Sequence, residues 1–164
     1  MRASTWLRAL AVLLALFAVG HTLGTAFPRV TRGPAEASVF DGMQAFRFPI
    51  LGFVRSHWDF YRGFAISVSI LLAALAVLAW QVATLSRDHP REALPQVVIL
   101  LFACLGLTLV SWRFFFAPPL IMASVATVIS LLAVISTLRQ GRDGETVFPL
   151  PGKRASSASL SRSG

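Results

Sequence analysis

The stretch PQVVILLFACLGLTLVSW, residues 95–112, contains 18 consecutive residues without a charged side chain. An α-helix rises about 1.5 Å per residue, so this stretch would be about 27 Å long, close to the thickness of the hydrocarbon core of a bilayer. Pro95 fits the first turn of such a helix, where a missing N–H is tolerated. The stretch therefore predicts a membrane-spanning helix.

Three further apolar stretches accompany this one, at about 6–27, 60–85 and 118–138. Because lipid offers no hydrogen bonds, each spanning backbone must satisfy its own polar groups by forming a helix. The composition agrees, since 55% of the 164 residues are hydrophobic and only 13% are charged, which is too little charge for the surface of a soluble domain. The sequence predicts an all-α fold, an integral membrane four-helix bundle formed by residues 1–138.

Basic residues are divided unequally between the two sides of this predicted bundle. Nine of the 15 lie on the side that holds both termini and the 86–94 loop, and six lie on the other side. Cytoplasmic loops are enriched in Arg and Lys, so we expect both termini in the cytoplasm. The charged residues that produce the net charge of +8 lie outside the apolar runs. We therefore interpret them as topology signals and anchors for lipid phosphates, and not as a nucleic-acid surface. Fourteen of the 15 basic residues are Arg, and the chain is rich in Ala, Leu and Val, which suggests a GC-rich bacterial genome. We therefore expect the membrane to be a bacterial inner membrane.

The first apolar stretch has an alternative interpretation. Its charged start, apolar middle and the small residues of Gly24-Thr25-Ala26 are also typical of a cleavable signal peptide. Cleavage would leave three spans and move the mature N-terminus to the outer side. We favour a retained span, because the apolar length already suffices to cross the membrane.

The loop between the first two spans contains a second predicted helix. Ser38 and Asp41 have the spacing of a capping box, and apolar residues then recur on one helical face: Val39, Phe40, Met43 and Phe46. This pattern predicts a short amphipathic helix in the outer interface, ended by Pro49.

Two other segments lie outside the predicted spans. Residues 113–119, RFFFAPP, are so few that they predict a tight hairpin between the third and fourth spans. Residues 139–164 are rich in Gly, Ser and Arg and lack the apolar content to fold, so we expect a disordered basic cytoplasmic tail.

The segment GHTLGTAF, residues 20–27, places His21 inside the first span. Ionisable groups within spans are rare and often functional, and no other lies well inside a predicted span. Gly20 and Gly24 flank it as a small-xxx-small surface on which a second helix can approach closely, with Gly63 and Ser67 at the matching depth of span two. We expect neutral His21 to join the two helices through Ser67, Tyr61 or a loop carbonyl, with ligand binding or proton transfer as the alternative.

A second group of polar residues precedes span two. Arg55, Asp59 and Arg62 are spaced i, i+4 and i+7, so on one helix the carboxylate would lie between two guanidiniums. His57 and Tyr61 would pair on an adjacent face. With His21 beneath them, these residues predict a polar mouth on the outer side that holds an anionic or polar head group. The alternative is an interfacial charge network without a ligand.

The remaining residues exclude several functions. Cys104 stands alone, so neither an intrachain disulfide nor a thiol redox pair can form. No metal-binding cluster or phosphate-cradling loop is visible, so we predict no metal and no cofactor, and the catalytic residues of any reaction are unknown.

Three functions remain. The first is a non-enzymatic accessory subunit, or a binder of a lipid or small amphiphile at the outer mouth. The second is a membrane enzyme acting on a lipid or quinone-like molecule, with His21 as acid or base and Asp59 orienting it. The third is a transporter component. The expected partners are membrane lipids and a protein partner or second copy of the chain.

Two short motifs carry a resemblance to a known group. GHTLG in span one and DFYRGF at the start of span two resemble a group of uncharacterised bacterial four-span inner-membrane proteins, and size and span count are loosely DoxX-like. The resemblance covers about residues 6–138. It implies no reaction, and it implies a four-helix bundle that gathers six residues at the outer end of spans one and two: Gly20, His21, Gly24, Asp59, Tyr61 and Gly63.

Overall fold

The computed structural model describes residues 2–26 and 31–147, with side chains within 2–25 and 31–142. Four long helices dominate these ranges: α1 (Ala3–Ala26), α3 (His57–Asp88), α4 (Pro90–Phe114) and α5 (Ala117–Val147). All four are long and apolar enough to cross a membrane. Between α1 and α3 lie a short helix, α2 (Pro34–Ala45), and an antiparallel hairpin of β1 (Arg47–Ile50) and β2 (Phe53–Ser56). The predicted helical bundle is confirmed, and the hairpin is an addition that the sequence patterns did not indicate.

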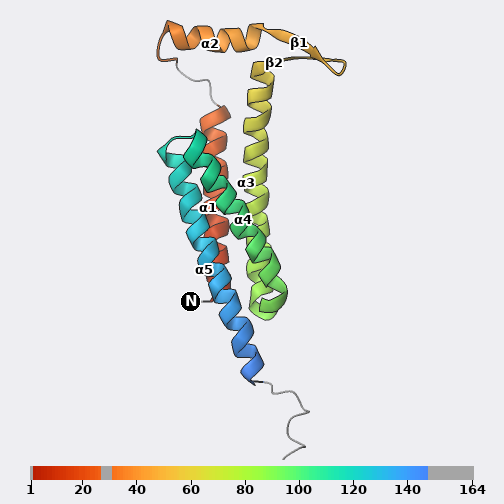
Figure 1. Ribbon diagram of the computed structural model, residues 1–164, viewed down its shortest axis with the longest axis vertical. Helices are drawn as coiled ribbons and strands as arrows, with labels where there is room; N and C mark the ends of the chain where they lie inside the picture. Colours follow the sequence, from red (N-terminus) through yellow and green to blue (C-terminus); the bar gives the residue numbers. More distant parts are fainter. Residues whose placement is uncertain (1, 27–30, 148–164) are drawn as a thin grey trace, which may run out of the picture.

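The four long helices alternate in direction along the chain (Figure 1). Helix α1 packs against α3 and α5, and α4 packs against α5 and α3. The start of α1, the α3–α4 connection and the end of α5 lie at one end of the bundle, which we call the tail end. Helix α2 and the hairpin lie across the top of α3 at the opposite end, which we call the hairpin end. The two ends of the described chain therefore share one side of the bundle.

The tightly packed core lies toward the tail end. Helix α1 contributes leucines and α3 contributes alanines, whose small side chains let the two backbones approach closely: Leu7, Leu10, Leu14, Ala76, Ala79 and Ala83. Along α3 the buried residues begin only at Leu72. The hairpin-end half of α3 therefore has no buried side chain, and it extends beyond the α4–α5 turn (Figure 1).

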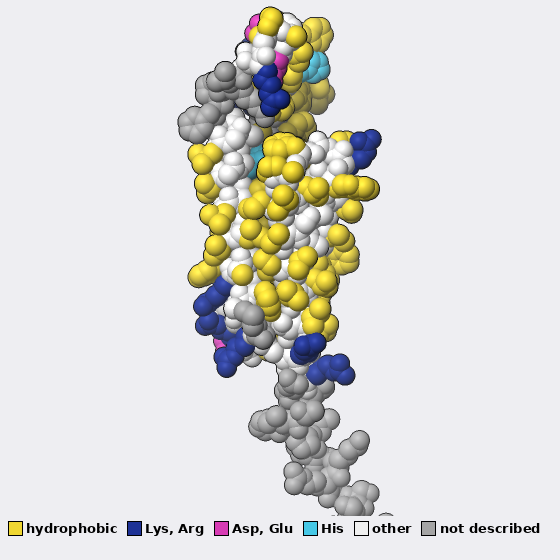
Figure 2. Space-filling model, turned by 90° about the vertical axis from the view of Figure 1, so that its left-hand side faces the viewer, with side chains coloured by type: hydrophobic (Ala, Val, Ile, Leu, Met, Phe, Trp, Pro, Cys, Tyr) yellow, Lys and Arg dark blue, Asp and Glu magenta, His cyan; other side chains and the backbone are white. Residues whose placement is uncertain are grey.

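The surface of the bundle is divided into zones (Figure 2). On the face shown, hydrophobic side chains are spread over the middle, and Lys and Arg side chains gather near the two ends. Exposed apolar residues occur on all four long helices, for example Leu16, Ile70, Phe102 and Val128. So continuous an apolar surface would be unfavourable in water, whereas it is favourable in contact with lipid.

The α3–α4 connection is shorter than the predicted 86–94 loop. Helix α3 runs to Asp88 and α4 begins at Pro90, so His89 alone separates them. Pro90 occupies the start of α4, and Pro95 lies inside the helix, not in its first turn as expected. The prediction for Pro95 was wrong because a proline five residues earlier already provides the start that prolines favour.

The segment before α3 also differs from its prediction. Helix α2 starts at Pro34 after Gly33, and the Ser38 hydroxyl donates to the Ala35 carbonyl without capping a helix start. Pro49 lies within β1 and does not end the helix. The hairpin turns at Leu51 and Gly52, which both have positive φ (47° and 84°), a geometry that matches the right-handed twist of the two strands.

Helix α5 is longer than the predicted fourth span. It continues to Val147, so the part of the expected disordered tail from 139 to 147 is helical instead. No proline interrupts the backbone hydrogen bonds before Pro149, and a formed helix extends readily through Arg, Gln and Glu. The rest of the predicted tail, 148–164, lies outside the described residues. The tight turn predicted at 113–119 is confirmed, since only Phe115 and Phe116 separate α4 from α5.

Candidate functional site

His21 connects α1 to α3. Its Nδ1 lies 3.0 Å from the Ser69 hydroxyl oxygen, and the pair is partly buried. Ser69 also donates a longer hydrogen bond of 3.4 Å to the Ala65 carbonyl of its own helix. The predicted connection between the two helices is confirmed, but its partner is neither Ser67 nor Tyr61. The Ser67 hydroxyl is exposed and donates to the Gly63 carbonyl within α3.

The His21–Ser69 hydrogen bond should contribute modestly to stability. Hydrogen bonds between membrane helices are worth about 0.6 kcal/mol on average and up to about 1.7 kcal/mol, because the unfolded chain in lipid finds other partners. We expect a coupling energy in this range from a double-mutant cycle of His21→Ala and Ser69→Ala. Unfolding of the detergent-solubilised protein by dodecyl sulfate measures it.

The control for this cycle is Ser67→Ala. This substitution removes a hydroxyl two residues away that bonds only within α3. Combined with His21→Ala, it should give additive losses. If the stability losses of His21→Ala and Ser69→Ala were also additive in the double variant, the His21–Ser69 contact would contribute nothing to stability.

The predicted glycine contacts do not form within the chain. Gly20, Gly24 and Gly63 are exposed, and a Cβ added to any of them would have no neighbour within 4 Å. Ser67 is likewise exposed. The prediction that these four residues pack α1 against α3 was wrong, because the close contact between the two helices lies nearer the tail end. The glycines instead leave an open strip on the hairpin-end half of the bundle.

Asp59 caps the start of α3. The Ser56 amide donates to Asp59 Oδ2 over 2.9 Å, and the Asp59 amide donates back to the Ser56 hydroxyl over 3.2 Å. The Ser56 hydroxyl itself lies 3.0 Å from the same carboxylate oxygen. This reciprocal pair is a capping box, and it occupies the Asp59 carboxylate.

The predicted arrangement of Arg55, Asp59 and Arg62 on one helical face was wrong. Arg55 belongs to β2, not to α3, so the i, i+4 relation does not apply to it. Its guanidinium lies over the Phe53 ring at 5.3 Å and donates to the Val54 carbonyl. Arg62 is exposed on α3, and within the described residues neither arginine forms an ion pair with Asp59.

His57 and Tyr61 do not pair with each other, and each belongs to a different set of aromatic rings. The His57 ring stacks on Phe46 at 5.8 Å and lies 5.1 Å from Phe48, while Tyr61 stacks on Trp58 at 5.3 Å. The His57 set also contains Phe60, and the Tyr61 set also contains Phe40. We call the two sets together the aromatic platform, since they join α2 and β1 to the first turns of α3: Phe40, Phe46, Phe48, His57, Trp58, Phe60 and Tyr61. The density of aromatic residues between 40 and 64 is the sequence signal that could have indicated it.

Arginine outnumbers carboxylate around the platform. Between residues 40 and 62, Arg47, Arg55 and Arg62 accompany two carboxylates, Asp41 and Asp59. Arg47 and Arg55 both lie close enough to act electrostatically on Asp59, whose oxygen is already bound to Ser56. The segment therefore carries one positive charge in excess. The hairpin end combines aromatic surface with excess positive charge.

Metal and thiol chemistry find little support in the part of the chain that the structure describes. Within residues 2–25 and 31–142, no three His, Cys, Asp or Glu side chains come together as metal ligands. Cys104 is buried between α4 and α5, where it accepts a 3.4 Å hydrogen bond from Ser130. Such a thiol is a packing residue.

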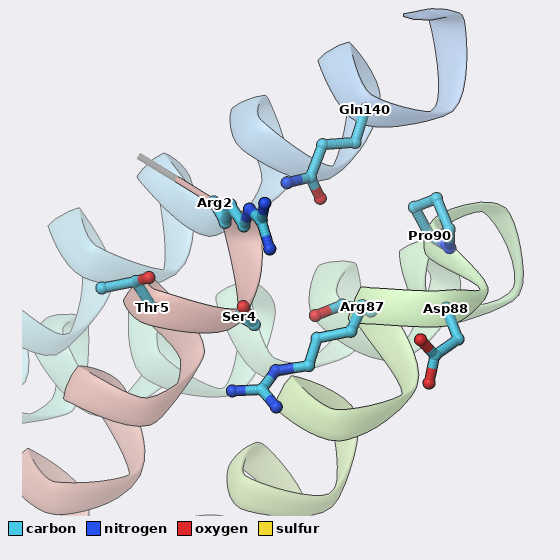
Figure 3. A pocket seen from close by; sticks show the side chains of 8 residues that line it. Arg2, Ser4, Thr5, Arg87, Asp88, Pro90 and Gln140 are labelled. Atoms are coloured by element: carbon cyan, nitrogen blue, oxygen red, sulfur yellow. The ribbon is translucent and has the colours of Figure 1, made fainter. Parts of the chain in front are cut away.

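A cavity of about 700 Å³ opens at the tail end, away from the residues predicted to form the site. Its lining includes Arg2 and Ser4 at the start of the chain, Arg87 and Asp88 at the end of α3, and Gln140 of α5 (Figure 3). The sequence indicated the two arginines only as topology signals. Their proximity arises from the packing of α1 beside α3, which no local pattern specifies.

The four apolar helices and their charged ends make this chain a multi-pass membrane protein. No family model, no curated protein and no solved structure matches it. The resemblance to four-span inner-membrane proteins therefore stays a prediction that rests on GHTLG and DFYRGF alone.

Proposed function

We propose that the protein is a non-enzymatic component of a bacterial inner membrane, with both termini in the cytoplasm, that binds an anionic amphiphile at its hairpin end. The single observation that carries this proposal is the hairpin-end half of α3, which lies below a cluster of arginines and buries no side chain before Leu72. An apolar helix face beneath unbalanced positive charge is complementary to a lipid with an anionic head group.

The head-group region of the proposed site is the aromatic platform with its arginines. Arg55 and Arg62 are exposed, and Asp59 is held in the capping box, so the guanidiniums are available to phosphate or carboxylate oxygens. Trp58 and Tyr61, one stacked on the other, have the amphipathic character that favours the membrane interface. The platform therefore suits the boundary between acyl chains and water.

The acyl-chain region lies directly along α3. Phe64, Ile70 and Leu71 are exposed there, and Leu23 of α1 is exposed at a similar depth. The partly buried His21–Ser69 pair offers a polar contact to a carbonyl or hydroxyl group of the bound molecule. The proposed site would therefore extend from the arginines to the His21–Ser69 pair, and binding there requires no reaction.

An enzymatic role is less well supported by the geometry. The alternative mechanism requires Asp59 to orient His21, but the partner of His21 is Ser69, ten residues and about 15 Å further along α3. The Asp59 carboxylate is also occupied by Ser56. A transporter role lacks a comparable observation, since the polar contacts between α4 and α5 in the apolar part of the bundle are the uncharged Thr108–Thr127 and Ser130–Cys104 pairs.

An accessory subunit is a second candidate, favoured by the open glycine strip. Gly20 and Gly24 lie one turn apart on α1 with no side chain above them, so a helix of a protein partner or of a second copy could approach closely. This role is compatible with lipid binding, because the platform lies beyond the strip. The same experiment can report on both.

Native mass spectrometry with lipidomics on gently extracted protein tests the proposal. We expect anionic lipid to co-purify with the wild type and to fall roughly fivefold in Arg55→Ala and in Arg62→Ala, since each arginine near the surface contributes about 1 kcal/mol to binding of anionic lipid. Arg139→Ala is the matched control, because it removes an exposed arginine from the opposite end. The spectra also report any partner protein or second copy.

The control separates a site from general charge attraction. Arg139→Ala should leave the anionic lipid content unchanged if the lipid binds at the hairpin end. Unaltered lipid in Arg55→Ala and Arg62→Ala would contradict the proposal. An equal loss in all three variants would do the same, because it would show attraction to net charge only.

A further inference from the structure

The tail-end cavity brings together two arginines, a buried serine and a helix start. The geometry points to a phosphate-binding site here, in which Arg2, Arg87 and the Ser4 hydroxyl hold the phosphate group at the N-terminus of α1. The site lies at the opposite end of the bundle from the proposed amphiphile site. It is independent of that proposal and uses different residues.

Ser4 is the residue that distinguishes this cavity from an ordinary charged surface. Its side chain is 5% exposed, and its hydroxyl has no hydrogen-bond partner among the described residues. In Figure 3 it points into the space between Arg2 and Arg87. The hydroxyl borders the cavity, so it is free to donate to a bound oxygen acceptor.

Ser86 provides the contrast within the same cavity. It is buried as deeply as Ser4, but its hydroxyl donates to the Ala83 carbonyl over 3.0 Å. Most buried serines in spanning helices are satisfied in this way by their own helix. Ser4 lies at the first turn of α1, where fewer preceding carbonyls are available, so its hydroxyl remains directed at the cavity.

The charges around Ser4 favour an anion. Within the described residues, neither Arg2 nor Arg87 forms an ion pair. The first turn of α1 contains no acidic residue, so its N–H groups and the positive end of the helix dipole are not compensated. Asp88 also lines the cavity, but in Figure 3 its carboxylate lies apart from the Arg87 guanidinium, and among the described residues the two form no ion pair. A phosphate would therefore meet two guanidiniums on opposite sides of a hydroxyl donor.

The position of the cavity suits a phosphate at the membrane surface. Arg8 lies one turn further along α1, with its guanidinium 5.3 Å from the Trp80 ring, and such Arg–Trp pairs favour the interface. Trp80 precedes Arg87 by two turns, or about 10 Å. The cavity of about 700 Å³ is larger than one phosphate ion, so it has space for the group that carries the phosphate. A phospholipid head group and a phosphorylated solute share this chemistry.

Two probes distinguish these sources, applied to full-length protein purified in detergent and freed of lipid. Inorganic phosphate is titrated by calorimetry, and phosphatidylglycerol is titrated by native mass spectrometry. The variants are Ser4→Ala, which changes no charge, and Arg87→Gln. Arg139→Gln is the matched control, since it removes an arginine from the same end that does not line the cavity. A thermal melt of each variant establishes that it is folded.

We expect Arg87→Gln to weaken binding of at least one probe roughly fivefold and Ser4→Ala to weaken it roughly threefold, with Arg139→Gln close to the wild type. Binding of inorganic phosphate would identify a solute site, and binding of phosphatidylglycerol alone would identify a lipid site. Absence of binding by both probes would overturn the inference. So would unchanged affinity in folded Ser4→Ala, or an equal loss in Arg139→Gln, because either would indicate diffuse charge attraction.

Discussion

Leu10→Ala should lower the free energy of unfolding by about 2–5 kcal/mol. Leu10 is fully buried on α1, within the core cluster that α1 shares with α3, α4 and α5. Truncation removes its packing contacts and leaves a cavity that the surrounding helices can only partly close. Unfolding of the solubilised protein by dodecyl sulfate, followed by helical circular dichroism, measures the loss.

Leu16→Ala is the matched control on the same helix. Leu16 is 60% exposed and faces outward, so the same chemical change should alter the stability by about 0.5 kcal/mol or less. Both leucines lie in the same apolar span, so the difference between their two stability losses measures packing against other helices and not contact with lipid. Equal losses at the two positions would contradict the packing of α1 in the core.

The spans could be predicted from the sequence because their signal is local. An uncharged run such as 95–112 needs only its length to indicate a spanning helix. The spacing of Ala76, Ala79 and Ala83 on one helical face is a local signal of the same kind, and all three are buried. His21 was placed against span two from its depth, although its partner differs by two residues from the expected Ser67.

The hairpin could not be predicted because its turn lacks the usual signal. Two-residue hairpin turns favour Asn-Gly or Asp-Gly, whereas this chain has Leu51-Gly52. Leu51 adopts a positive φ of 47°, which is uncommon for a residue without a short polar side chain. Its side chain is 95% exposed, so no packing signal accompanied it either.

The errors at the candidate site follow from the missed hairpin. The predicted face of Arg55, Asp59 and Arg62 assumed one continuous helix, and β2 places Arg55 outside it. The same hairpin brings Phe46 and Phe48 onto His57, a contact that depends on tertiary structure. The errors for Arg55, His57 and Tyr61 therefore arise at the junction between hairpin and helix, where contacts depend on tertiary structure.

The two halves of the bundle differ in a way that suits their proposed roles. Toward the tail end, leucines and alanines hold α1 and α3 together. Toward the hairpin end, a Cβ added to Gly20, Gly24 or Gly63 would have no neighbour within 4 Å, and α3 has no buried side chain between His57 and Leu71. A rigid half can position the platform, and an open half leaves lipid or a partner helix free to approach.

Ala79→Leu should test this division directly, because it enlarges a fully buried residue at the α1–α3 contact. Added methylene groups in a packed interior force side chains and backbone apart, at a cost of about 1–3 kcal/mol. Ala74→Leu is the matched control, since Ala74 is exposed on the same helix and a leucine there would face lipid with little effect on stability. Unfolding by dodecyl sulfate compares the two variants.

The comparison also bears on the proposed amphiphile site. If Ala79→Leu loosens the tail-end half while α3 stays helical, anionic lipid at the hairpin end should remain bound, because Arg55 and Arg62 lie several turns from position 79. Loss of the lipid together with stability would instead show that the platform depends on the α1–α3 contact for its position. Equal stability of Ala79→Leu and Ala74→Leu would contradict the close packing of α3 on α1, and with it the rigid half of the bundle.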